Sequence, residues 1–126
     1  MNATKNCRLV RRAQIPSGNP KSETIRKLND EFRRTGAGGR VVATPGIVAL
    51  PTPQQLAILT AVRTFNQFSS ENDPYGEHDF GIIAHDGESI YFKIDYYDKE
   101  LSGGSEDPAD PTQTTRVMTI MLAHEY

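Results

Sequence analysis

The chain has 126 residues, enough for one domain with a modest core, and its 37% hydrophobic and 24% charged residues are typical of a soluble globular protein. Its single cysteine excludes an internal disulfide or a zinc site built from cysteines. The sequence has neither a signal peptide nor a run of about 18 apolar residues for a membrane helix, so we expect a cytoplasmic protein with no membrane contact.

The formal net charge of −2 hides a strong asymmetry along the chain. Residues 1–70 hold 11 Lys/Arg and 3 Asp/Glu, a net charge of +8, whereas residues 71–126 hold 3 Lys/Arg and 13 Asp/Glu, a net charge of −10. One interpretation is that the halves neutralise each other within the fold or between subunits. The other is that the acidic half meets a basic partner.

The N-terminal residues 1–21 are basic and rich in helix breakers, which predicts a flexible arm ahead of one domain over residues 22–126. The cations of this arm are Lys5, Arg8, Arg11 and Arg12. A nucleic-acid-binding arm is the alternative interpretation, because cations of this kind seek phosphates.

A helix is predicted over residues 23–35, capped by Ser22. Ile25, Leu28 and Phe32 form one narrow apolar stripe, which is typical of a surface helix packed on a core.

The glycines of RRTGAGGRVV (residues 33–42) suggest a phosphate-binding loop at first sight. Such a loop lies between a strand and the start of a helix, whereas these glycines follow a helix and precede a strand. We therefore interpret the stretch as a helix stop, with Gly36 in the left-handed C′ position. A basic patch that binds phosphate is the alternative, and it would use Arg33, Arg34 and Arg40.

A strand is predicted over residues 40–44, followed by a type II turn at Pro45-Gly46. A second helix then starts with Thr52 as cap and Gln55 completing a capping box. Its core stripe is predicted to contain Ala57, Ile58, Ala61, Val62, Phe65 and Phe68.

FGIIAH and ESIYFKIDYYD flank Asp86-Gly87, which predicts a two-residue type I′ hairpin. This turn places Phe80 opposite Lys93. If the ladder continues, it also places His78 opposite Asp95, within hydrogen-bonding reach.

Residues 115–123 read as a closing strand with apolar residues on both faces, so it should be central, although a helix capped by Thr112 is an alternative. The predicted order is α-β-α-β-β-β. It corresponds to an α+β fold with two helices packed on a mostly antiparallel sheet of about four strands.

The acidic segments around this sheet predict a protein-binding face rather than a catalytic site, because no nucleophile and no second histidine at ligand spacing accompany them. No cofactor or metal is expected. The predicted face contains Asp73, Tyr75, Glu77, His78, Asp79, Asp95, Tyr97, Asp98, Glu106 and Asp107. A metal-assisted hydrolase that uses His78, Asp79 and Asp95 is the alternative.

FRRTGAGGRVVATPGIVAL, AVRTFNQF, NDPYGEHDFG, FKIDYYD and GSEDPADPTQTTRVMTIMLAHEY together resemble a family of small bacterial proteins known only as a domain of unknown function. The resemblance covers Leu28 to Tyr126. It implies a cytoplasmic accessory protein of plasmids and other mobile elements, often encoded near antirestriction genes, and it brings no established activity or catalytic residue.

These observations predict a non-enzymatic accessory protein that acts by binding. Its acidic face would engage a host or plasmid protein with a basic surface, as an anti-defence inhibitor would. Binding of nucleic acid through the basic arm is the alternative, and the sequence leaves the oligomeric state open.

Overall fold

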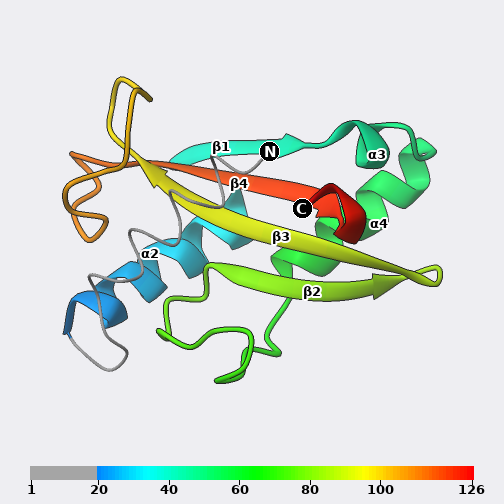
Figure 1. Ribbon diagram of the computed structural model, residues 1–126, viewed down its shortest axis with the longest axis horizontal. Helices are drawn as coiled ribbons and strands as arrows, with labels where there is room; N and C mark the ends of the chain where they lie inside the picture. The colour runs from blue at the N-terminus through cyan, green and yellow to red at the C-terminus, as the bar shows by residue number, and fades with distance from the viewer. Residues whose placement is uncertain (1–19) are drawn as a thin grey trace.

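The computed structural model describes residues 20–126, which form three α-helices, a four-stranded sheet and a short 3-10 helix (Figure 1). In chain order the elements are α2 (Pro20–Thr35), β1 (Gly39–Ala43), α3 (Pro45–Val48), α4 (Thr52–Arg63), β2 (Phe80–His85), β3 (Glu88–Tyr97), β4 (Thr115–Leu122) and η1 (Ala123–Glu125). The predicted α+β class is confirmed. The predicted basic arm lies almost entirely outside the described residues and stays a prediction.

The strand order in the sheet is β1-β4-β3-β2. Only the β1–β4 pair is parallel, whereas β4–β3 and β3–β2 are antiparallel. The segment after Thr114 is therefore a strand rather than a helix, and it is central, because strands flank it on both sides. This position explains its apolar residues on both faces.

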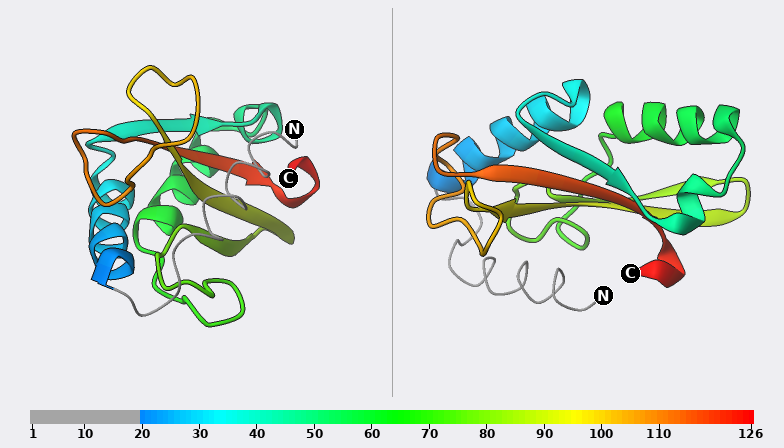
Figure 2. Two further views of the ribbon diagram at one scale, coloured as in Figure 1. Left: turned by 60° about the vertical axis from the view of Figure 1, so that its left-hand side comes forward. Right: turned by 90° about the horizontal axis from the view of Figure 1, so that it is seen from above.

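Both long helices cover the same face of the sheet (Figure 2). Beneath them, every second residue of β3 is buried: Ile90, Phe92, Ile94 and Tyr96. They pack with helix residues such as Ile25, Phe32, Ile58 and Val62, and this layer is the hydrophobic core.

Helix α2 starts at Pro20, so the prediction of Ser22 as its cap is wrong; Ser22 lies buried in the first turn. The buried residues of α2 are Ser22, Ile25, Asn29, Phe32 and Arg33. Asn29 thus occupies the position between Ile25 and Phe32 that was predicted for Leu28, which is only half-buried.

The glycines after α2 stop the helix, as predicted. Gly36 has a φ of +77°, and its N–H donates to the Phe32 carbonyl at 2.7 Å, which closes the last turn. Gly39 has a different function: a Cβ there would lie 2.3 Å from the Arg116 carbonyl oxygen, so β1 can approach β4 only with glycine at this position.

The predicted type II turn at Pro45-Gly46 is wrong, because these residues begin the short helix α3. The Ile47 and Val48 N–H groups both donate to the Thr44 carbonyl. Glu125 holds this start in place by accepting hydrogen bonds from the Thr44 hydroxyl and the Gly46 N–H (2.9 Å).

The capping box predicted for α4 does not form either. Pro51 occupies the cap position, and the Gln55 amide instead donates to the Val48 and Leu50 carbonyls, joining α4 to α3. The helix ends at Arg63, so Phe65 and Phe68 reach the core from the segment that follows it.

The hairpin is confirmed in turn and register. Asp86 and Gly87 have φ angles of +53° and +81°, as a type I′ turn requires, and Phe80 pairs with Lys93.

Candidate functional site

The segment of residues 69–79 between α4 and β2 carries half of the predicted acidic face and lies against α2 and β3. Its centre is His78, which has a φ of +56° and therefore leaves the strand direction. The predicted His78–Asp95 pair does not form, because the β2–β3 ladder ends at Phe80 and the imidazole faces α2 instead.

The His78 ring lies among two carboxylates and one aromatic ring. Its Nδ1 is 2.9 Å from Asp30 Oδ1, its Nε2 is 3.7 Å from Asp73 Oδ2, and the ring stacks on Phe68 with centroids 3.8 Å apart. Burial would raise the pKa of Asp30, but the hydrogen bonds from His78 and Arg33 outweigh it and hold that pKa below its ordinary value. Since an ionised carboxylate only accepts, Nδ1 carries the proton in this contact.

Asp73 bends the chain that carries His78. Its Oδ1 accepts the backbone N–H groups of Glu77 and His78, both at 3.1 Å, which fixes the turn ahead of β2. Burial raises the pKa of Asp73, and the nearby charge of Asp79 raises it further. The carboxyl group therefore shapes the turn, although its negative charge is unfavourable there.

A buried polar hub joins this segment to α2, β3 and β4. The Asn29 amide nitrogen donates to the Glu77 carbonyl at 3.0 Å and to the Tyr96 hydroxyl at 2.7 Å, and that hydroxyl donates to Glu77 Oε1 at 3.0 Å. Arg116 completes the hub by donating to Asn29 Oδ1 and to the Pro108 carbonyl, both at 2.6 Å. These contacts connect the segment of residues 69–79 to α2, β3, β4 and the connection between β3 and β4 at Pro108.

Arg33, predicted to belong to an exposed basic patch, is only 2% exposed. Its guanidinium donates to Asp30 at 2.9 Å and to the Phe65 carbonyl at 3.1 Å, and it lies 5.1 Å from the Phe68 ring centroid. Of the three arginines in the predicted patch, only Arg34 and Arg40 are exposed.

Asp95 lies on the sheet face opposite the helices, since it alternates with the core residues of β3. It is 1% exposed and forms an ion pair with the buried Lys93 two residues earlier. Neither His78 nor Asp79 combines with it into a metal site, because the described residues contain no group of three His, Cys, Asp or Glu side chains able to hold a metal ion.

The predicted acidic face is thus divided in two. Four of its carboxylates are buried, namely those of Asp73, Glu77, Asp79 and Asp95. Its remaining members are exposed or half-buried: Tyr75, His78, Tyr97, Asp98, Glu106 and Asp107. Three of these, Asp98, Glu106 and Asp107, lie in the connection of residues 98–114 between β3 and β4, which we name the acidic loop.

Hydrogen bonds within the acidic loop order it. Asp98 accepts the Ser102 N–H at 2.9 Å and hydroxyl at 3.0 Å, and Asp110 accepts bonds from Thr112 and Gln113. These bonds lower the pKa values of both carboxyl groups. The loop therefore presents ionised carboxylates on a fixed backbone at one end of the sheet, opposite the hairpin turn (Figure 1).

Four residues of the site were not predicted from the sequence: Asn29, Asp30, Lys93 and Arg116. For two of them a signal was present: Asn29 lies on the buried stripe of α2, and Arg116 shares its strand face with Met118 and Ile120. A polar side chain at a core position usually indicates a buried hydrogen-bond network.

The first testable prediction concerns Asp73. We expect Asp73→Asn to raise the free energy of unfolding at pH 7, because the amide oxygen still accepts both N–H groups while the disfavoured charge is removed. Because the pKa of Asp73 is raised in the folded state, the free energy of unfolding of the wild type falls as the pH rises above about 3.8. Below that pH the wild type and Asp73→Asn should therefore have similar free energies of unfolding.

Denaturant unfolding between pH 7 and a pH below about 3.8 measures this difference in the free energy of unfolding, with Asp73→Ala as the comparison. That variant leaves two N–H groups without their acceptor and should lose about 1–3 kcal/mol. A lower stability for Asp73→Asn than for the wild type at pH 7 would contradict the assignment.

Residues 43–125 match the model of the family described as "Protein of unknown function (DUF3768)", and the chain belongs to that family. No curated protein and no solved structure matches the chain. Within residues 20–126, no helix has both the length and the apolarity needed to cross a membrane.

Proposed function

We propose that the protein is a non-enzymatic binding domain whose acidic loop engages a basic surface on a protein partner. The observation that carries this proposal is the ordered, ionised loop, which bears five carboxylates and one lysine within residues 98–114. Because the backbone is already fixed, little conformational entropy is lost on binding. Complementary charge also accelerates the association of the loop with a basic partner, and it disfavours binding of acidic proteins.

The biological setting we propose is a cytoplasmic accessory role in a bacterial mobile element, with an anti-defence inhibitor as its most specific form. Support comes from the resemblance to small bacterial proteins of such elements and from the charge of the loop. Carboxylates on a rigid loop can occupy a groove that otherwise binds the phosphate backbone of DNA.

The geometry gives less support to a metal-assisted hydrolase and to a phosphate-binding basic patch, whereas nucleic-acid binding through the basic arm lies almost entirely outside the described residues. A metal-assisted hydrolase would need Asp95, which is paired with Lys93, and His78, whose Nδ1 is bonded to Asp30. A phosphate-binding basic patch would need Arg33, which is buried in the core.

The test is affinity capture from bacterial host lysate with the full chain, with and without nuclease treatment. Glu100→Lys/Glu106→Lys reverses two exposed charges of the acidic loop, and neither carboxylate takes part in the bonds that order it. We expect this variant to lose at least about tenfold in captured partner, and wild-type capture to weaken with salt and persist after nuclease.

The matched control is Glu31→Lys/Glu71→Lys, which makes the same change in net charge at exposed positions away from the acidic loop. It should retain capture. Equal capture by the loop variant, or loss of the partner on nuclease treatment, would contradict the proposal.

A further inference from the structure

A small cleft lies at the other end of the sheet, between the hairpin turn and the start of α4. Its volume is about 210 Å³, and it is lined by Leu50, Gln54, His85, Asp86, Glu88, Ile90 and Leu122. This volume is below the ~300 Å³ at which pockets for drug-sized ligands begin, so it suits a single side chain.

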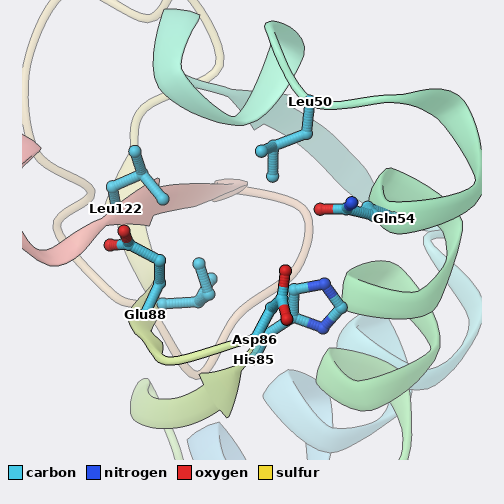
Figure 3. Close-up of a pocket in the computed structure, with 7 residues that line it drawn as sticks. Leu50, Gln54, His85, Asp86, Glu88 and Leu122 are labelled. Atoms are coloured by element: carbon cyan, nitrogen blue, oxygen red, sulfur yellow. The ribbon is translucent and has the colours of Figure 1, made fainter.

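The cleft combines an apolar floor with a polar rim (Figure 3). Leu50, Ile90 and Leu122 supply the apolar surface. On the rim, the side chain of Gln54 points inward from α4, and Asp86 lies beside the His85 ring at the hairpin turn.

Asp86 and Glu88 are exposed, and no hydrogen bond or ion pair joins either carboxylate to another described residue. His85 adds a second feature: its Nε2 is buried and makes no hydrogen bond. A buried polar atom without a partner is unfavourable, and a bound water, ion or ligand group can supply the missing hydrogen bond.

We propose that this cleft binds the aliphatic cationic side chain, lysine or arginine, of a protein partner. The apolar floor fits the methylene stem, and either of the two carboxylates, which lie on different sides of the cleft, fits an ammonium or guanidinium head (Figure 3). His85 and Gln54 can accept hydrogen bonds from its remaining N–H groups. The inference rests on the proposed function, because the bound lysine or arginine belongs to the basic protein partner proposed there. It adds a second contact point at the opposite end of the sheet from the acidic loop.

The type I′ turn fixes the backbone that carries the two carboxylates. Asp86 and Gly87 adopt positive φ angles, and His85 pairs directly with Glu88 across the ladder. This arrangement allows a conservative test, because asparagine also tolerates the left-handed conformation at position 86.

The experiment is methyl NMR on the full chain, titrated with the Nα-acetyl N-methylamides of lysine and arginine. We expect saturable shifts of the Leu50 and Leu122 methyl groups with at least one of them, at concentrations on the order of millimolar for so small a ligand. The norleucine analogue keeps a linear alkyl side chain without the charge. It should bind at least about fivefold more weakly.

Asp86→Asn/Glu88→Gln should also weaken binding of the cationic amide at least about fivefold. The control Glu100→Gln/Glu106→Gln makes the same change of charge in the acidic loop and should leave the affinity unchanged. Absence of saturable shifts, equal binding of norleucine, or unchanged affinity in Asp86→Asn/Glu88→Gln would overturn the inference. The norleucine comparison uses the wild type, so it does not depend on a variant folding. Because no partner protein is present, failure here is distinct from failure of capture by the acidic loop.

Discussion

Arg116→Ala is expected to lower the free energy of unfolding by about 3–5 kcal/mol, because it empties a buried site and leaves two buried acceptors without their donor. Asn29 Oδ1 and the Pro108 carbonyl would each lose a donor that now lies at 2.6 Å. The guanidinium also lies 5.3 Å from the Tyr96 ring centroid, a favourable contact that truncation would abolish.

Chemical denaturation measures this loss, with Arg34→Ala as the control on an exposed face of α2. Such surface substitutions usually change stability by less than about 0.5 kcal/mol. The double variant Asn29→Ala/Arg116→Ala should lose less than the sum of the single variants, because the two residues share one bond. A loss below about 1 kcal/mol for Arg116→Ala would show that the hub does not hold the segments together.

Gly39→Ala is expected to cost about 2–3 kcal/mol, as overpacking of a well-filled interior does. The added methyl group would lie 2.3 Å from the Arg116 carbonyl oxygen and 2.9 Å from the Phe32 ring. The first contact is with backbone, which cannot turn aside without separating β1 from β4.

Thermal unfolding of Gly39→Ala and Gly103→Ala makes the comparison. At Gly103 the nearest atom to a new Cβ is Asp98 Oδ2 at 3.9 Å, so that variant should unfold close to the wild type. Equal melting temperatures for both variants would refute the close approach of β1 and β4.

Local patterns predicted much of the fold. Asp86-Gly87 predicted both turn and register, because a two-residue loop leaves one pairing for the strands. The apolar residues on both faces of β4 predicted its central place. The order of helix, glycines and strand in RRTGAGGRVV correctly predicted a helix stop at Gly36.

The candidate site was predicted less well, because its partners are far apart in sequence. His78 bonds to Asp30, 48 residues earlier, and Arg33 is buried by Phe65 and Phe68 from the segment after α4. No periodicity within a helix or strand contains these contacts. The predicted continuation of the ladder to Asp95 also failed, because Asp73 accepts two backbone N–H groups and turns the chain before β2 begins.

The carboxylates of the acidic half of the sequence therefore divide into a buried and an exposed group. Some of these carboxylates are buried, as is that of Glu77, which accepts the Tyr96 hydroxyl, whereas others are exposed on the acidic loop, at the hairpin turn and in the segment before β2. A tail or a disordered segment of similar charge would not show this division.

Parallel measurement of stability and capture on Glu77→Ala and Glu100→Lys/Glu106→Lys tests that division most directly. The structure predicts that Glu77→Ala lowers the free energy of unfolding by about 1–3 kcal/mol, since a buried hydroxyl loses its acceptor. The loop variant should unfold like the wild type and yet lose capture of the basic partner. A loop variant that binds as well as the wild type would contradict the account.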